Sequence, residues 1–549
     1  MNYGKVKIHN SRLDKSYLSV NLIDEISRVA FGGVIGMRRQ QIKKISNGMI
    51  NIFLIPLTLI ALLGGIQLVL SNFQSLSRTG FIIVSSVLLA ILVYIISLPI
   101  RKLINRCWKC LLWYIRKHKV PFLLSLTVVT IMWQLAVVFL LSGTGGWDPY
   151  TIMSTAIRQI SPSVASMYFS LSPNTLLLTF IEHGLWLISG QPQLHYFVVL
   201  LNVVNIILID SAVLMSAVVV KHWFGRQYEK LLIVMSWVLF VVSPWIAIPY
   251  TDNWAYFLTA LLLYVGDVYG RCQYKYSRYM LAAGIGFIII FAYFMKPSLV
   301  ITVLAAGIVY ILKLMVDGKN MINRTLIISF ALILVGGGIG LTIHKTIVAR
   351  QDLVSIKPGR AHPLVHFMAM GMKGSGAFYA PDVALDEQIK SPSARKKADV
   401  KLLIERFKDF HGLSNYGKFL AQKQINNVSD GSFGWGLEGG FLTTNESNNE
   451  KLNRTLIRRL FAKDGVVQVN NFEYRFYAQL IWCGVLANLL FTISTDRWRV
   501  QFLKYSVVGF MLFLLLFEGG RSRYVIQFLP LIFMLATVGG VRLISRLKR

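Results

Sequence analysis

Hydrophobic runs of about 20 residues recur along most of this 549-residue chain, separated by short polar breaks. A helix crosses the hydrocarbon core with about 20 apolar residues and satisfies its own backbone hydrogen bonds there. The pattern therefore predicts an all-α polytopic membrane protein. We expect about twelve spans, at 48–71, 79–99, 120–142, 196–220, 231–249, 253–270, 277–295, 297–315, 325–345, 473–492, 503–518 and 523–543.

The composition supports this fold class, since 55% of the residues are hydrophobic and only 15% are charged. The net charge of +32 would suggest a nucleic-acid ligand in a soluble protein. Here the cations lie in short loops beside the predicted spans, where the positive-inside rule puts them. We therefore expect a multi-pass protein of the cell membrane, in contact with the lipid bilayer and without a nucleic-acid partner.

The topology depends on the short apolar stretch 173–189, which contains Glu182 and His183. If this stretch does not cross the membrane, the basic loops and both termini all fall in the cytoplasm, as the positive-inside rule requires. We therefore interpret it as a juxtamembrane or re-entrant helix on the outer face, packed against protein.

Five segments follow from this topology. The long outer loop contains 12 of the 25 acidic residues, mixed with basic residues and glycines, and its amphipathic stretch 396–410 predicts a helix. A loop of this length without structure would be unusual. The segments are a basic cytoplasmic N-terminus (1–47), a transmembrane hairpin (48–99), a transmembrane core with the first outer loop 143–195 (120–345), a small extracytoplasmic loop domain (346–472), and C-terminal spans with a basic cytoplasmic tail (473–549).

Asp148 is the first candidate catalytic residue, because it follows the outer end of a predicted span in the sequence GTGGWDPYTI. A carboxylate there, followed by Pro149, fits a helix N-cap. It also fits a general base at the rim of a cavity. The spacing leaves both interpretations open.

Three cations at outer turns run against the positive-inside preference: Lys296 in YFMKPSLV, and Arg521 and Arg523 in FEGGRSRY. Each fits a snorkelling anchor or a turn cap. Together they indicate an anionic partner, and a lipid phosphate matches guanidinium and ammonium groups well. Asp252 in IPYTDNWAY and Tyr524 lie at the same turns and are candidate substrate-binding residues.

The loop domain adds weaker candidates. Trp435 and Glu438 lie among glycines in GSFGWGLEGGF, and a tryptophan beside a carboxylate suits a sugar ring, although turns of a small domain explain the pattern equally well. Lys373 is a further substrate-binding candidate. His362 and His366 are four residues apart, but Pro363 interrupts a shared helical face and no third ligand is evident, so we do not expect zinc.

The order of these features resembles the GT-C superfamily of membrane glycosyltransferases, especially the branch of protein O-mannosyltransferases and lipid A aminoarabinose transferases. The matching parts are Asp148, the outer segment 150–189, and the span 196–220 running into KHWFGRQ. The PYTDNWAYF turn is similar to the Pro-Asp turn of that superfamily. The MKPS and RSRY motifs are also similar to those of related Gram-positive integral membrane proteins. The resemblance covers residues 120–545, but SPN at 172–174 replaces the usual His-Pro-Pro.

The resemblance implies an inverting transfer of a sugar from a polyprenyl-phosphate donor to an extracytoplasmic glycan or glycopolymer. Asp148 would be the base, and Lys296, Arg521 and Arg523 would hold the donor phosphate. Some superfamily members bind a divalent cation such as Mg²⁺ or Mn²⁺ near the first-loop carboxylate. No second acid accompanies Asp148 here, which leaves metal dependence open, and we expect no other cofactor.

Two other functions remain open. A lipid-linked oligosaccharide polymerase would share the many spans, the large outer loop and the outer arginines. A lipid-linked sugar flippase or transporter predicts inverted repeats and polar residues throughout the bilayer, whereas mid-span charge is nearly limited to Asp210 here.

Overall fold

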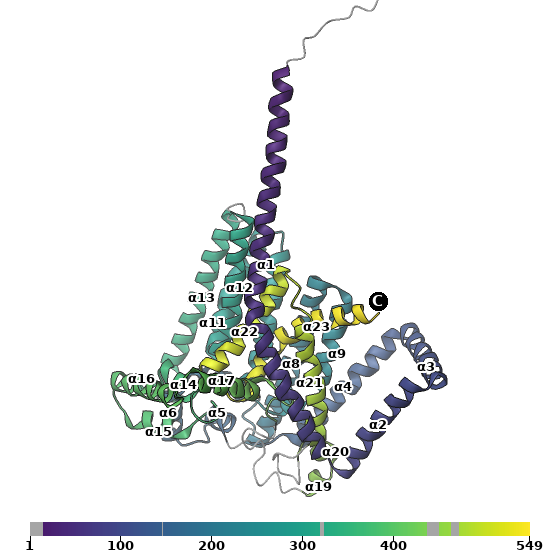
Figure 1. The fold of residues 1–549 in the computed structure, drawn as a ribbon. Helices are drawn as coiled ribbons and strands as arrows, with labels where there is room; N and C mark the ends of the chain where they lie inside the picture. The colour runs from purple at the N-terminus through teal and green to yellow at the C-terminus, as the bar shows by residue number, and fades with distance from the viewer. Residues whose placement is uncertain (1–14, 145–146, 319–322, 436–449, 463–471, 549) are drawn as a thin grey trace, which may run out of the picture.

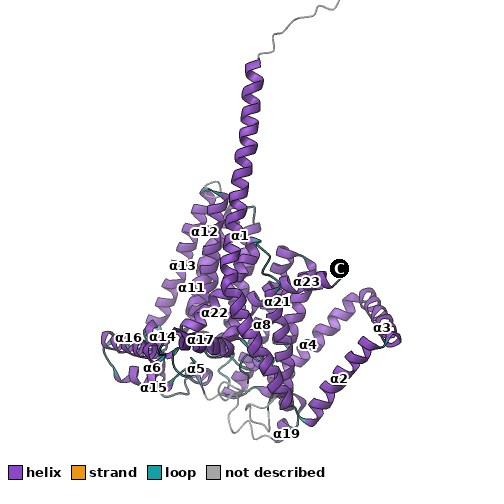
Figure 2. Cartoon of the chain, in the orientation of Figure 1, coloured by secondary structure: helices purple, strands orange, loops and turns teal. Residues whose placement is uncertain are grey.

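The computed structural model describes residues 15–144, 147–318, 323–435, 450–462 and 472–548. Every regular element within these ranges is a helix (Figure 2). The all-α prediction is therefore confirmed.

Nine helices in the described ranges are long and apolar enough to cross a membrane, or ten if a bent pair counts as one span. The apolar part of α1 covers residues 40–74. Each of the nine coincides with a predicted span. They are α1 (Lys15–Gln74), α2 (Arg78–Ile96), α4 (Lys119–Leu141), α8 (Leu194–Phe224), α11 (Lys275–Met295), α12 (Val300–Asp317), α13 (Arg324–Arg350), α22 (Trp498–Leu516) and α23 (Leu529–Leu547).

The three other predicted spans, 231–249, 253–270 and 473–492, form helices that fall short of this test. α9 (Arg226–Ser236) begins with charged residues and continues into a π turn and a 3₁₀ turn at Pro244. α10 (Thr251–Arg271) contains Asp252 and Asp267, and α21 (Phe472–Leu490) begins with charged residues. All three pack against other helices of the bundle, α9 on α8 and α23, α10 on α8 and α11, and α21 on α1 and α23.

Extensive contacts between helices hold the bundle together, and the contact between α11 and α13 is the most extensive among the described helices. A Cβ atom at Gly286 would overlap the backbone of α13, and one at Gly336 would overlap the backbone of α11. Small residues therefore allow these two backbones to pack directly, as is common between membrane helices.

The basic loop after the second span is itself helical, which the sequence analysis did not anticipate. α3 (Leu98–Lys117) begins at Ser97, whose side chain caps the helix, and ends at Arg116 and Lys117. None of its residues is buried. Together α2, α3 and α4 form an arm that leaves the rest of the bundle (Figure 1).

The segment 143–195, predicted to be the first outer loop, contains α5 (Asp148–Ala156), α6 (Pro162–Leu171), a 3₁₀ turn (Pro173–Thr175) and α7 (Leu176–Ile188). The chain bends by 102° between α6 and the helical segment 173–188, which makes this pair a broken span or a re-entrant loop. The bend is compatible with the re-entrant helix expected at 173–189, and the topology stays a prediction.

In the predicted loop domain, α14, α15 and α16 lie beside α5 and α6 (Figure 1), whereas α17 contacts α1 and α22, and α20 contacts α4 and α21. α16 matches the helix predicted at 396–410. Arg406 of α16 forms a buried bidentate ion pair with Asp382 of α15, at 2.6 and 2.7 Å. The helices are α14 (Leu364–Met370), α15 (Ala380–Gln388), α16 (Pro392–Asp409), α17 (Leu413–Val428), α19 (Glu450–Asn453) and α20 (Leu456–Phe461).

Candidate functional site

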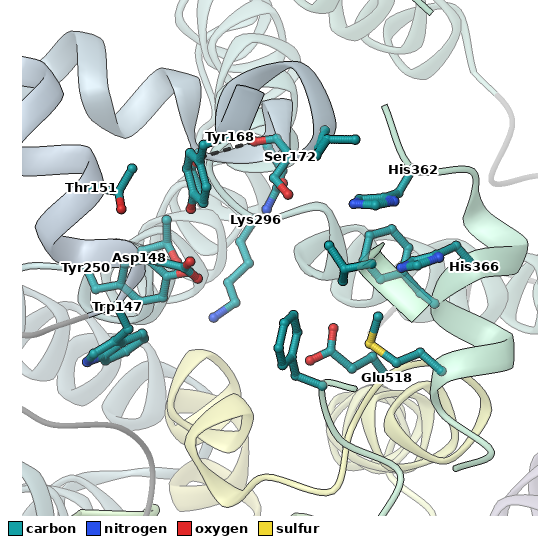
Figure 3. A pocket seen from close by; sticks show the side chains of 18 of the residues that line it. Trp147, Asp148, Thr151, Tyr168, Ser172, Tyr250, Lys296, His362, His366 and Glu518 are labelled. Atoms are coloured by element: carbon teal, nitrogen blue, oxygen red, sulfur yellow. Dashed lines mark hydrogen bonds between the residues drawn. The ribbon is translucent and has the colours of Figure 1, made fainter. Parts of the chain in front are cut away.

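A cavity of about 710 Å³ lies where α5 and α6, the turns at Lys296 and Arg521, and the helices α14 and α15 meet. It collects five residues that the sequence analysis singled out from distant parts of the chain. Those five are Asp148, Lys296, Arg521, Arg523 and Tyr524. Figure 3 shows Asp148 and Lys296 on one side and His362 and His366 on the other.

Asp148 is the first residue of α5, and Trp147 occupies the N-cap position without a side-chain capping bond. The Asp148 carboxylate instead accepts a hydrogen bond of 2.9 Å from the Tyr250 hydroxyl. Tyr168 forms a further side-chain hydrogen bond with it. The capping interpretation is therefore not observed, and the carboxylate is held by tyrosines at the cavity wall.

Lys296 and Arg523 share one buried carboxylate, Asp252. Lys296 forms an ion pair with Asp252, and the Arg523 Nε lies 3.7 Å from its other oxygen. The Arg523 guanidinium also lies 4.2 Å from the ring centre of Trp147, in cation–π contact. Asp252 is 2% exposed and does not line the cavity, so it positions the two cations from behind the cavity wall.

Arg521 differs from these two cations. Within the described part of the chain it has no ion pair with a carboxylate, and its guanidinium lies 5.8 Å from the centre of the Phe378 ring. The turn that carries it is tight, because Gly520 has φ +66° and its amide donates to the Asn427 side chain at 2.5 Å. Its neighbour Tyr524 donates a hydrogen bond of 2.9 Å to Glu518.

Lys423 of α17 joins the loop domain to this turn. The buried ammonium donates to three backbone carbonyls, those of Gly371 (2.6 Å), Leu515 (3.0 Å) and Phe517 (2.7 Å). These carbonyls lie at the end of α14 and the end of α22. Sequence reasoning missed Lys423, since a lysine within a loop helix gives no sign of burial.

A second group of titratable side chains lines the opposite side of the cavity. The His362 Nδ1 lies 2.6 Å from Asp386 Oδ2, and the His366 Nδ1 lies 3.1 Å from the same oxygen and 3.5 Å from Asp399. Burial lowers the pKa of His366, but hydrogen bonds and charge from the two carboxylates outweigh it and raise that pKa to about 9. The sequence analysis saw no third ligand beside the two histidines, and Asp386 corrects that expectation.

A family model described as "conserved hypothetical integral membrane protein" matches residues 40–541. The chain belongs to this family. No curated protein and no solved structure matches this chain. Membership confirms an integral, multi-pass membrane protein in contact with the bilayer, and it assigns no chemistry to the cavity.

Three other predicted site residues of this family member lie elsewhere. Trp435 is 1% exposed in the hydrophobic core, where its indole donates to the Phe461 carbonyl at 3.0 Å and packs edge-on against Trp245. It is not part of the cavity lining, so it is not placed to hold a sugar there. Lys373 is exposed outside the cavity, and Glu438 lies outside the described residues.

Proposed function

We propose that this protein is a membrane glycosyltransferase that moves a sugar from a polyprenyl-phosphate donor to an acceptor outside the cytoplasmic membrane. The observation that supports this most is the convergence of the Asp148 carboxylate with three cations in a single cavity. A volume of about 710 Å³ falls in the range that holds a small ligand, such as a sugar with its phosphate.

In the proposed reaction, Asp148 takes the proton of an acceptor hydroxyl while the oxygen of that hydroxyl bonds to the anomeric carbon of the donor sugar. The bond between that carbon and the phosphate oxygen breaks, and polyprenyl phosphate leaves with the electron pair. The attack comes from the face opposite the leaving group, so the anomeric configuration inverts. Tyr250 orients the Asp148 carboxylate through its hydrogen bond.

Negative charge grows on the departing phosphate, and cations stabilise it. Lys296 and Arg523 already share Asp252, so this trio carries one positive charge, and Arg521 adds a second. Glu518 and Glu387 also line the cavity and would repel a phosphate. In the proposal the phosphate binds beside Lys296, Arg523 and Arg521, and the Tyr524 hydroxyl donates to Glu518 at the same turn.

A divalent cation at Asp148 does not fit the residues present. The groups bonded to Asp148 are the hydroxyls of Tyr250 and Tyr168, whereas Mg²⁺ prefers carboxylate, carbonyl and water oxygens. Within the described chain, the group of three metal-ligating side chains lies on the opposite side of the cavity. No step of the proposed reaction runs through a cation at Asp148.

The proposal puts the cavity on the extracytoplasmic side and both termini in the cytoplasm. Its support is the positive-inside distribution of the loops. The N-terminal part of α1 also lies at the end of the bundle opposite α5, α6 and α14 (Figure 1).

A transfer assay tests the function. Purified protein is incubated with a panel of polyprenyl-phosphate sugars and cell-envelope glycopolymers, together with Asp148→Asn and the control Glu387→Gln, which removes another cavity carboxylate. We expect transfer by the wild type and by the control, and a loss of about 10²–10⁴-fold in Asp148→Asn. Donor binding without transfer across the panel would contradict the proposal and favour a flippase.

A further inference from the structure

The wall of the cavity opposite Asp148 contains an unusual buried cluster of two histidines and two aspartates. His362 precedes α14, His366 lies on α14, Asp386 on α15 and Asp399 on α16. Three of the four side chains are almost completely buried: His366 is 1% exposed, Asp386 0% and Asp399 1%. Three helices of the loop domain therefore bring four potential metal ligands to one point.

Several polar atoms of this cluster have no hydrogen-bond partner, although the groups are described and buried. They are the Nε2 of His366, Asp386 Oδ1 and Asp399 Oδ2. A buried polar atom without a partner costs about 1–3 kcal/mol, so a cluster of three calls for a ligand that satisfies them. The histidine and aspartate atoms are the kinds of donor that bind divalent transition metals.

The charges of the cluster also call for a bound cation. Two buried carboxylates need about two positive charges for compensation. Protonating both histidines would supply them, but the two imidazole rings stack with centres 4.2 Å apart and planes 15° apart, so two imidazolium charges would repel each other. A divalent cation between two neutral imidazoles and two carboxylates compensates the charge without that repulsion.

From this geometry we propose that His362, His366 and Asp386, supported by Asp399, form a site for a divalent transition-metal ion of the zinc class. The ligand atoms of the first three residues all lie within 4.8 Å of one another. Bonds of ~2.0–2.1 Å in a tetrahedron would separate ligand atoms by about 3.3 Å, so small side-chain rotations suffice. Zn²⁺ is favoured because it accepts nitrogen and oxygen ligands in irregular geometries.

The site has an open side. Both histidines line the cavity, whereas the carboxylates are buried behind them. A bound ion would join α14, α15 and α16 and present its remaining coordination position to the cavity, facing Asp148 (Figure 3). An oxygen of a cavity ligand would fit there. The site stands independently of sugar transfer, because its evidence is the ligand set and not the reaction.

Metal analysis of the full-length protein, purified without chelators, tests the site. We expect about one Zn²⁺ per chain, a melting temperature that falls after chelation and recovers with added Zn²⁺, and a low-coordinate visible spectrum when Co²⁺ replaces it. His366→Ala should lose the ion and the Co²⁺ spectrum. The control His195→Gln, which changes an exposed histidine at the start of α8, should keep both.

If His366→Ala does not fold, Asp399→Asn and chelation of the wild type answer the same question. The proposal is overturned if the wild type binds no stoichiometric ion, gives only the spectrum of aqueous Co²⁺ and melts at the same temperature with chelator. A protonated His366 would then compensate the carboxylates. In that case stability would fall as the pH rises from 6.5 to 9, the interval between the unfolded and folded pKa of His366.

Discussion

The two sides of the cavity solve the problem of buried charge differently. On the transmembrane side, Asp148 is held by tyrosines, and Lys296 and Arg523 share Asp252 and stack on aromatic rings. On the loop-domain side, His362, His366 and two aspartates are packed together with polar atoms left unpaired. The first arrangement pairs two cations with one buried carboxylate, whereas the second sets two buried carboxylates against two histidines and calls for a further cation.

The two sides also differ in what fixes the positions of their residues. Asp252 and Lys296 sit at the ends of α10 and α11, which have 21 residues each and pack against other helices of the bundle. His366 and Asp386 come from α14 and α15, which have 7 and 9 residues and therefore little hydrophobic area of their own to fix their positions. We therefore expect mutations to damage the two sides in different ways.

The largest effect on stability should come from Asp252→Asn. This change leaves Lys296 and Arg523 without their shared partner in a buried setting, and breaking a buried ion pair costs about 3–5 kcal/mol. Thermal unfolding in detergent measures it. A melting temperature unchanged from the wild type would show that the two cations are solvated by other groups, and the transmembrane side would not be complete by itself.

A smaller loss of stability should follow Lys423→Met, which removes a link between the loop-domain side and the transmembrane side of the cavity. The three carbonyls of Gly371, Leu515 and Phe517 lose their shared donor, at a cost of about 2–4 kcal/mol in the free energy of unfolding. The matched control is Gln422→Met, since Gln422 is the exposed neighbour of Lys423. Equal melting temperatures for the two variants would mean that Lys423 does not hold the turn of Arg521.

Arg521→Ala should change binding rather than folding. Removing a charge-assisted contact to phosphate costs about 1.5–3 kcal/mol, or roughly 10–150-fold in the dissociation constant of the donor lipid. Lys373→Ala is the control, because Lys373 is exposed outside the cavity and should leave affinity unchanged. Equal losses of donor affinity in Arg521→Ala and Lys373→Ala would point to general attraction of anionic lipid and not to a phosphate site.

Much of the transmembrane side was predictable because its three cations lie at turns that the predicted topology puts outside the cytoplasm. Lys296, Arg521 and Arg523 are cations at turns where the positive-inside rule disfavours them, and all three line the cavity. Span positions were predictable for the same local reason, from runs of apolar residues. α10 is less apolar than those spans, and its Asp267 is buried through bonds to His222, Trp223 and Arg271, which no local pattern reveals.

The loop-domain side was not predictable because its ligands are far apart in the sequence. Asp386 and Asp399 lie 20 or more residues after His366 and meet it only when α15 and α16 pack on α14. The same limit applies to Lys423 and to Trp435, whose glycine-rich setting predicted a sugar site while packing made it a core residue. Neighbours in three dimensions, and not residue types, decide these roles.

The measurement that tests the central claim most directly counts bound donor and transferred sugar in one sample of Asp148→Asn. The donor is the labelled polyprenyl-phosphate sugar that the wild type converts best. We predict donor binding equal to the wild type, with transfer lower by about 10²–10⁴-fold. Transfer at the wild-type rate, or loss of donor binding together with transfer, would contradict the division of the cavity into a phosphate-binding group and a separate catalytic base.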